Sequence, residues 1–165
     1  MIAMDASRSG PRPRGRPIPG HHRTVEPQTD TQIVAAVEAG TVRETAATAA
    51  ALARDLRAPL RFVCVRPRAS SILGEPQYQR KLTRDLFRAR RTLDVALAAA
   101  ANAGVMARGE IVAGDAAEGI LKAAAARPTR LIIVAQRRHR FGRSVSRRVI
   151  RHAGVPVVVA ASTAG

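Results

Sequence analysis

Short, nearly continuous apolar runs occur five times along the chain, at residues 33–37, 60–65, 105–112, 131–134 and 155–159. Each run has the length of a strand and is rich in Val, Ile or Leu, although the third alternates roughly with polar residues. Runs of this kind are typical of strands that are buried on both faces of a parallel sheet. The pattern therefore predicts five buried strands.

Helical patterns fill the four intervals between these runs, and we expect helices over about 41–56, 78–102, 116–126 and 145–152. The second helix has apolar residues at spacings of three and four, which is the period of one helical face. These residues are Leu82, Leu86, Ala89, Leu93, Ala96, Leu97 and Ala100. Gly104 is a typical helix stop, and Asp115 and Ser144 are expected to cap the last two helices.

Strands that alternate with helices predict an α/β fold with a five-stranded parallel sheet and helices on both faces, wound in the Rossmann-like manner. In such sheets, ligands bind beyond the carboxyl ends of the strands, near the point where the strand order reverses. Four segments end strands here and are candidate ligand loops: 38–40, 65–66, 114–115 and 135–144. The chain has no internal repeat, so we expect one domain, over residues 32–161.

The two ends of the chain differ from this domain in composition. Proline alternates with arginine or glycine over residues 11–20, a pattern that forms neither a helix nor a central strand. We therefore expect residues 1–31 to be a disordered basic tail, with a nucleic-acid-binding arm as the alternative. Residues 162–165 form a short C-terminal tail.

The formal net charge of the chain is +16, and nearly all of the positive charge is arginine, since Lys81 and Lys122 are the only lysines. Guanidinium groups suit bidentate contact with phosphate or carboxylate, which makes an anionic partner plausible. The alternative is that a chain so rich in arginine and alanine reflects a genome of high GC content.

Candidate catalytic chemistry is sparse. Ser144, Ser146 and His152 lie close in sequence, but we expect the helix to direct them apart, and Ser144 and His152 are better explained as partners of the helix ends. No group of His, Cys and carboxylate residues has the spacing of metal ligands. The sequence therefore favours a binding protein over an enzyme, with no metal.

The single cysteine, Cys64, stands in an apolar strand, which favours a core thiol in a reducing compartment. No apolar run approaches the roughly 18 residues that a membrane-spanning helix needs. The N-terminus also lacks the apolar segment of a secretory signal. We therefore expect a cytoplasmic protein that does not engage membranes.

Three segments carry a resemblance to a known family: IVAAVEAG, IVAGDAAEGIL and, above all, RLIIVAQRRHRFGRSVSRRVIRHAGVPVVVA. Over about residues 32–161 the chain resembles the universal stress protein family. The resemblance implies an adenine nucleotide alpha hydrolase-like fold and a stress-response role exercised through unidentified protein partners. It also implies a homodimer formed through the last strand, Val155–Val159.

In the ATP-binding members of that family, the fourth strand is followed by G-x2-G-x9-G-[ST], whose backbone amides hold the phosphates. Ala135, Arg138 and Arg143 stand where the three glycines belong, Ser144 keeps the hydroxyl position, and the loop is about five residues shorter. Glu38 replaces the usual aspartate after the first strand. Glycine allows a positive φ and close approach of the backbone, so its loss should remove the phosphate cradle. We expect no resident cofactor, or ATP held weakly.

Arginine side chains and a helix N-terminus are left to hold an anion at this place. The candidate ligand-binding residues are Glu38, Val63, Ala135, Arg137, Arg138, Arg140, Gly142, Arg143, Ser144 and Val145. Two alternatives stay open: an adenine-nucleotide binder, and a polyanion or nucleic-acid binder that uses the arginine-rich loop and the tail.

Overall fold

The computed structural model describes residues 31–68, 74–136 and 144–161, in which strands and helices alternate. The strands are β1 (Gln32–Ala36), β2 (Leu60–Arg66), β3 (Ala107–Ala113), β4 (Thr129–Ala135) and β5 (Val157–Ala160). The helices are α1 (Val42–Asp55), α2 (Glu75–Asn102), α3 (Ala116–Ala125) and α4 (Val145–His152). The predicted tails, except Thr31, and the arginine-rich loop at 137–143 lie outside the described residues.

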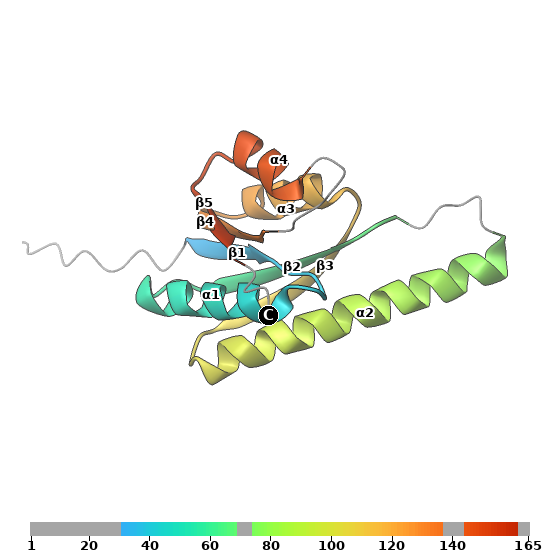
Figure 1. Ribbon diagram of the computed structural model, residues 1–165, viewed down its shortest axis with the longest axis horizontal. Helices are drawn as coiled ribbons and strands as arrows, with labels where there is room; N and C mark the ends of the chain where they lie inside the picture. Colours follow the sequence, from blue (N-terminus) through green and yellow to red (C-terminus); the bar gives the residue numbers. More distant parts are fainter. Residues whose placement is uncertain (1–30, 69–73, 137–143, 162–165) are drawn as a thin grey trace, which may run out of the picture.

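The five strands form one parallel sheet in the order β3-β2-β1-β4-β5 (Figure 1). β1 lies at the centre, where Ile33 is opposite Leu60 of β2 on one side and Leu131 of β4 on the other. The chain runs outward from β1 to β3 and then crosses to β4, so the strand order reverses between β1 and β4. The predicted five-stranded parallel α/β architecture is confirmed.

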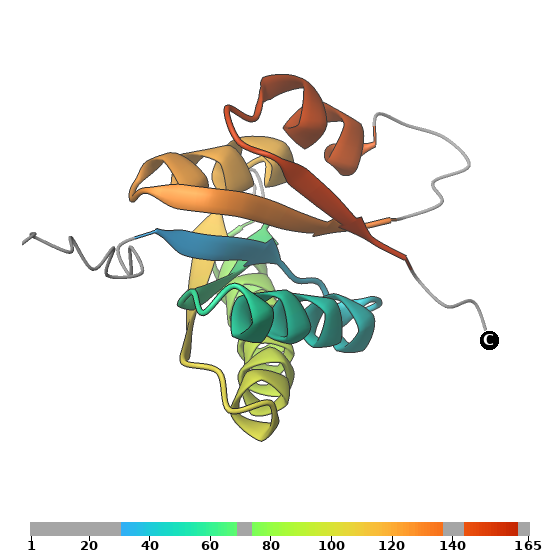
Figure 2. The same cartoon turned by 90° about the vertical axis from the view of Figure 1, so that its left-hand side faces the viewer.

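Alternate side chains of each strand point to opposite faces of the sheet and so build two cores. Ile33 and Phe62 belong to the core beneath α1 and α2, whereas Val34 and Val63 belong to the core beneath α3 and α4. Figure 2 shows α1 and α2 on one side of the sheet and α3 and α4 on the other. The predicted covering of both faces is therefore confirmed.

Some element boundaries differ from the prediction. α2 begins at Glu75, because Pro76 occupies its first turn, where a missing N–H costs nothing. β3 begins at Ala107. Gly104 ends α2 with a φ of +70°, and the Val105 amide still donates to the Ala100 carbonyl of α2 at 2.9 Å, so Val105 belongs to the turn and not to the strand. The predicted helix stop at Gly104 is therefore in place, and the turn after it is longer than expected.

The predicted apolar face of α2 is buried only in the second half of the helix. Ala89, Leu93 and Ala96 are buried, while Leu82 and Leu86 are half-buried. Neither leucine belongs to the core cluster, and Figure 1 shows the N-terminal part of α2 extending past the ends of the strands, so the sheet covers this part of the helix less than the rest.

Candidate functional site

A pocket of about 230 Å³ lies at the carboxyl ends of β1, β2 and β4. It occupies the place where the strand order reverses, as the fold class predicts. Its strand-side wall is apolar and includes Val63, Val65 and Val134. The strands place these valines there because each strand sends every second side chain to the α3–α4 face.

The first turns of α3 and α4 form the opposite wall, through Ala116, Ile120 and Val145 among others. α3 approaches the sheet closely because Gly119 has no side chain. A Cβ at Gly119 would lie 3.2 Å from methyl groups of both Val65 and Val112. The lack of a side chain at Gly119 thus lets α3 lie close to the strands that line the pocket.

An ion pair joins the two helices that border the pocket. Asp115 caps α3 by accepting from the Glu118 amide at 3.0 Å, and its other carboxylate oxygen accepts from Arg148 Nη1 at 2.8 Å. The hydrogen bond from Arg148, and then that from Glu118, hold the pKa of Asp115 below its usual range. The prediction of Asp115 as a cap is confirmed, but its link to α4, 33 residues away, was not predicted.

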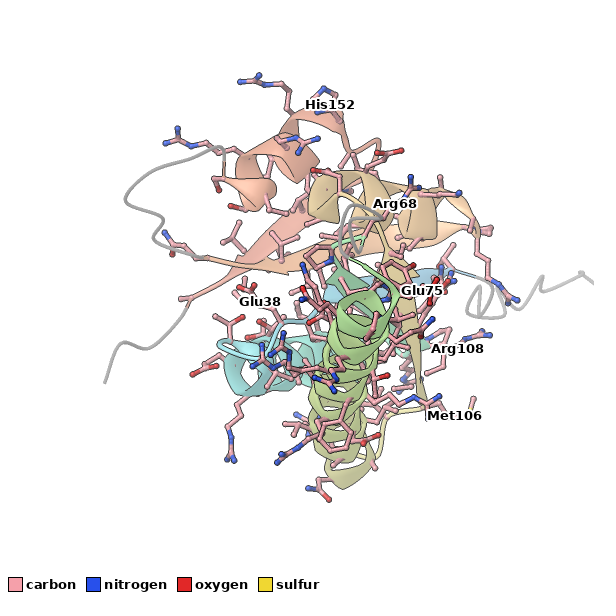
Figure 3. All side chains as sticks on the ribbon, turned by 90° about the vertical axis from the view of Figure 1, so that its right-hand side faces the viewer. Glu38, Arg68, Glu75, Met106, Arg108 and His152 are labelled. Carbon is pink, nitrogen blue, oxygen red and sulfur yellow. The ribbon has the colours of Figure 1, made fainter. Side chains whose placement is uncertain are left out.

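The start of α4 places two hydroxyl groups at the pocket. Ser144 caps the helix, and its Oγ lies 3.5 Å from the Arg147 amide and 2.6 Å from Ser146 Oγ. The expectation that the helix directs Ser144 and Ser146 apart is wrong, since the cap position lies outside the helix and turns back toward residue 146. His152 does lie apart, on the outer helical layer and well separated from Glu38 (Figure 3).

Glu38 follows β1 at the edge of the pocket, in the turn closed by the Thr41 amide on the Glu38 carbonyl at 3.1 Å. On the other face of the sheet, Cys64 is 7% exposed, and burial raises the pKa of its thiol, with a smaller contribution from the charge of Glu38. A thiol with a raised pKa is a poor nucleophile at neutral pH. The prediction of Cys64 as a core residue is therefore confirmed.

The structure brings half of the predicted ligand residues together. Glu38, Val63, Ala135, Ser144 and Val145 all line the pocket. The other five, Arg137, Arg138, Arg140, Gly142 and Arg143, lie outside the described residues.

Sequence reasoning missed the wall that α3 contributes and the hydroxyl of Ser146. The small residues at 116 and 119, directly after a capping aspartate, were the available signal for a helix packed closely on the strand ends.

The chemistry that this arrangement supports is binding of a small, mostly apolar ligand. The helix starts carry partial positive charge, the two serines can donate hydrogen bonds, and Glu38 can accept them. Within residues 31–68, 74–136 and 144–161, no three His, Cys, Asp or Glu side chains are grouped to hold a metal ion. No helix in these ranges is both long and apolar enough to cross a membrane.

The strand order and the pocket at its reversal point define a doubly wound α/β domain. The model of the universal stress protein family matches residues 31–161, and the chain belongs to that family. The match covers all of the described elements.

Solved structures agree with this assignment. Universal stress protein UspA from Lactobacillus plantarum has a TM-score of 0.68 at 21% identity, covering 79% of this chain and 97% of that one. A family member from Burkholderia pseudomallei gives 0.61 at 27% identity, with coverages of 80% and 96%. The Archaeoglobus fulgidus protein in complex with dAMP gives 0.60 at 22% identity, with coverages of 79% and 98%. Among curated proteins, none matches this sequence significantly.

Proposed function

We propose that this universal stress protein is a stress-response binding module that takes the nucleoside part of an adenine nucleotide in its pocket and holds the phosphates only weakly. The pocket at the strand-order reversal, apolar along its strands and bordered by two helix N-termini, carries the proposal. Relatives of the same fold have been solved with dAMP, with AMP and with cAMP. Their ligands support adenine nucleotides as the proposed chemical class.

The size of the pocket favours a compact ligand. The described residues enclose about 230 Å³, which is less than the roughly 300–1,000 Å³ of common ligand pockets. A base and a sugar place apolar faces against the valines, while their hydroxyl and amino groups can bond to Glu38, Ser144 and Ser146.

Weak phosphate binding follows from the sequence after β4. The glycine positions of the ATP-binding motif hold Ala135, Arg138 and Arg143, and residues with a side chain disfavour the positive φ that a backbone cradle uses. The helix N-terminus at Ser144 still favours an anion. Contacts from exposed arginine side chains are screened by salt, so they give low and salt-dependent affinity.

Filling the pocket tests this function directly. Ala116 lines the pocket at the first turn of α3, and Ala125 is exposed in the last turn of the same helix. We expect Ala116→Leu to weaken AMP binding at least about tenfold, or about 1.4 kcal/mol, in calorimetric titration. Ala125→Leu makes the same chemical change on the same helix and should bind as the wild type does. Equal affinities of the two variants would contradict the proposal.

We further propose that the protein acts as a homodimer through β5, in the cytoplasm, and without catalytic turnover. β5 is the edge strand beyond β4, and it is short and apolar. An exposed apolar edge favours pairing with a second chain.

The buried free thiol of Cys64 fits a reducing compartment. Incubation with ATP should release no phosphate above the rate of a blank.

A further inference from the structure

α2 presents a row of arginines on the side that it turns away from the sheet. Arg80, Arg84, Arg88 and Arg91 are exposed and follow one another at spacings of four, four and three residues, so they share one helical face. We call these four residues the arginine stripe. Phe87 lies beside them and is 62% exposed.

The stripe is available for an external partner. Across residues 31–68, 74–136 and 144–161, no ion pair joins any of the four arginines to a carboxylate. The N-terminal part of α2, where the stripe begins, also extends past the strand ends (Figure 1). The four exposed guanidinium groups can therefore be approached from solvent.

The dimensions of the stripe match a phosphate backbone. Arg91 lies eleven positions after Arg80, so at a rise of 1.5 Å per residue the row is about 16 Å long. One strand of duplex DNA presents a phosphate about every 3.4 Å along its axis, so about five phosphates lie over that length. The four guanidinium groups can each bind a phosphate in a bidentate way.

We propose that the arginine stripe binds the phosphate backbone of duplex DNA without reading the base sequence. This proposal does not rest on the nucleotide pocket. It also differs from binding by the arginine-rich loop or the tail, because it uses described residues on another helix.

Three observations favour duplex DNA over other polyanions. A membrane-binding helix needs an apolar face for the lipid, but the apolar face of α2, including Ala89 and Leu93, is already buried in the core. Single strands are bound by stacking on several aromatic rings, and this face offers Phe87 alone. The major groove of B-form DNA admits a helix between the two phosphate backbones, whereas that of A-form RNA is too deep and narrow to do so.

The test uses the full chain and the fluorescence anisotropy of a labelled DNA duplex of about three helical turns over a salt series. The variant replaces all four stripe arginines by glutamine, a comparably good helix former. The plot of log affinity against log salt should lose about 0.9 of its slope for each arginine, or about 3.6 in all. Two duplexes of unrelated sequence should bind the wild type equally, within about threefold.

A matched control changes the same amount of charge elsewhere. It replaces four exposed arginines by glutamine: Arg43, Arg127, Arg130 and Arg151. For this control, the slope of log affinity against log salt should stay at the wild-type value. If the quadruple stripe variant loses its helical circular dichroism, the pair Arg80→Gln and Arg84→Gln alone should remove about 1.8 of the slope.

Three results would overturn the proposal. The first is a stripe variant with unchanged salt dependence, and the second is an equal loss in stripe variant and control, which would assign binding to net charge. The third is a wild type that binds anionic phosphatidylserine vesicles, single-stranded DNA or duplex RNA more tightly than duplex DNA.

Discussion

Two phenylalanines of this chain occupy opposite environments. Phe62 is fully buried between the sheet and the α1–α2 layer, whereas Phe87 is 62% exposed on α2. The chain has only three phenylalanines and no tryptophan, and among the residues that the structure describes Phe62 is the largest fully buried side chain. The alanine-rich helices around it have few large groups that could move to fill its place.

This contrast gives a prediction about stability. Phe62→Ala should lower the free energy of unfolding by about 3–5 kcal/mol, since it removes buried apolar area and leaves a cavity. Phe87→Ala should change it by less than about 0.5 kcal/mol. Urea unfolding monitored by circular dichroism measures both. Similar losses in the two variants would show that the assignment of the core is wrong.

The Asp115–Arg148 pair gives a prediction about pH. The folded state lowers the pKa of Asp115, so this carboxylate adds stability above its unfolded value of about 3.9, and the gain is lost as the pH falls through the folded value. Asp115→Asn keeps a capping side chain but removes the charge. Its deficit in stability should be largest at neutral pH and should close below about pH 4.

A double-mutant cycle provides the control for this pair. Arg148→Gln should show the same closing deficit, and the double variant should lose less than the sum of the two single changes. Denaturant unfolding at neutral and acid pH supplies the numbers. A deficit of constant size across that range would mean that the pair does not stabilise the fold through its charge.

At the scale of elements, the sequence predicts what depends on local periodicity. Five apolar runs became five strands, but the prediction that all five are buried is wrong: the inner strands β1, β2 and β4 are mostly buried, whereas β3 and β5 are half-buried or exposed along most of their length because they form the edges of the sheet. The predicted start of α2, at about residue 78, is late, because a proline such as Pro76 is typical of loops although the first turn of a helix also tolerates it.

The candidate site was predictable where it depends on the strands, but not where it depends on contacts of the helices. The strand-end residues Glu38, Val63 and Ala135 follow from strand positions and from the family resemblance. The Asp115–Arg148 contact and the Ser144–Ser146 contact depend on how two helices pack and on how one cap turns back. No periodic pattern encodes them.

The edge strand β5 gives the prediction at this scale. Val159 is 38% exposed on β5, and Met106 is 83% exposed at the opposite edge, just before β3. Light scattering of the wild type should give twice the chain mass of 17.6 kDa. Val159→Lys should give the monomer mass, because a charged edge resists pairing.

Met106→Lys is the matched control for the dimer. It adds the same charge at the other sheet edge and should remain a dimer. A wild type that is monomeric at a concentration on the order of tens of micromolar would contradict the proposed dimer.

At the scale of the whole molecule, the positive charge and the apolar pocket are expected to act on different parts of one ligand. The chain has a net charge of +16, its pocket is apolar, and the sequence after β4 lacks the glycines of a phosphate cradle. We therefore expect the nucleoside part of a ligand to bind in the pocket, and the phosphate part to depend on screened arginine side chains.

Calorimetric titration of adenosine, AMP and ATP at about 0.05 and 0.3 M salt tests this account most directly. We predict that ATP exceeds AMP in affinity by no more than about tenfold, or about 1.4 kcal/mol, and that the difference shrinks at the higher salt. Adenosine should keep its affinity at both salt concentrations. An ATP affinity more than about a hundredfold above that of AMP at the higher salt would contradict the account, because it would require an intact phosphate cradle.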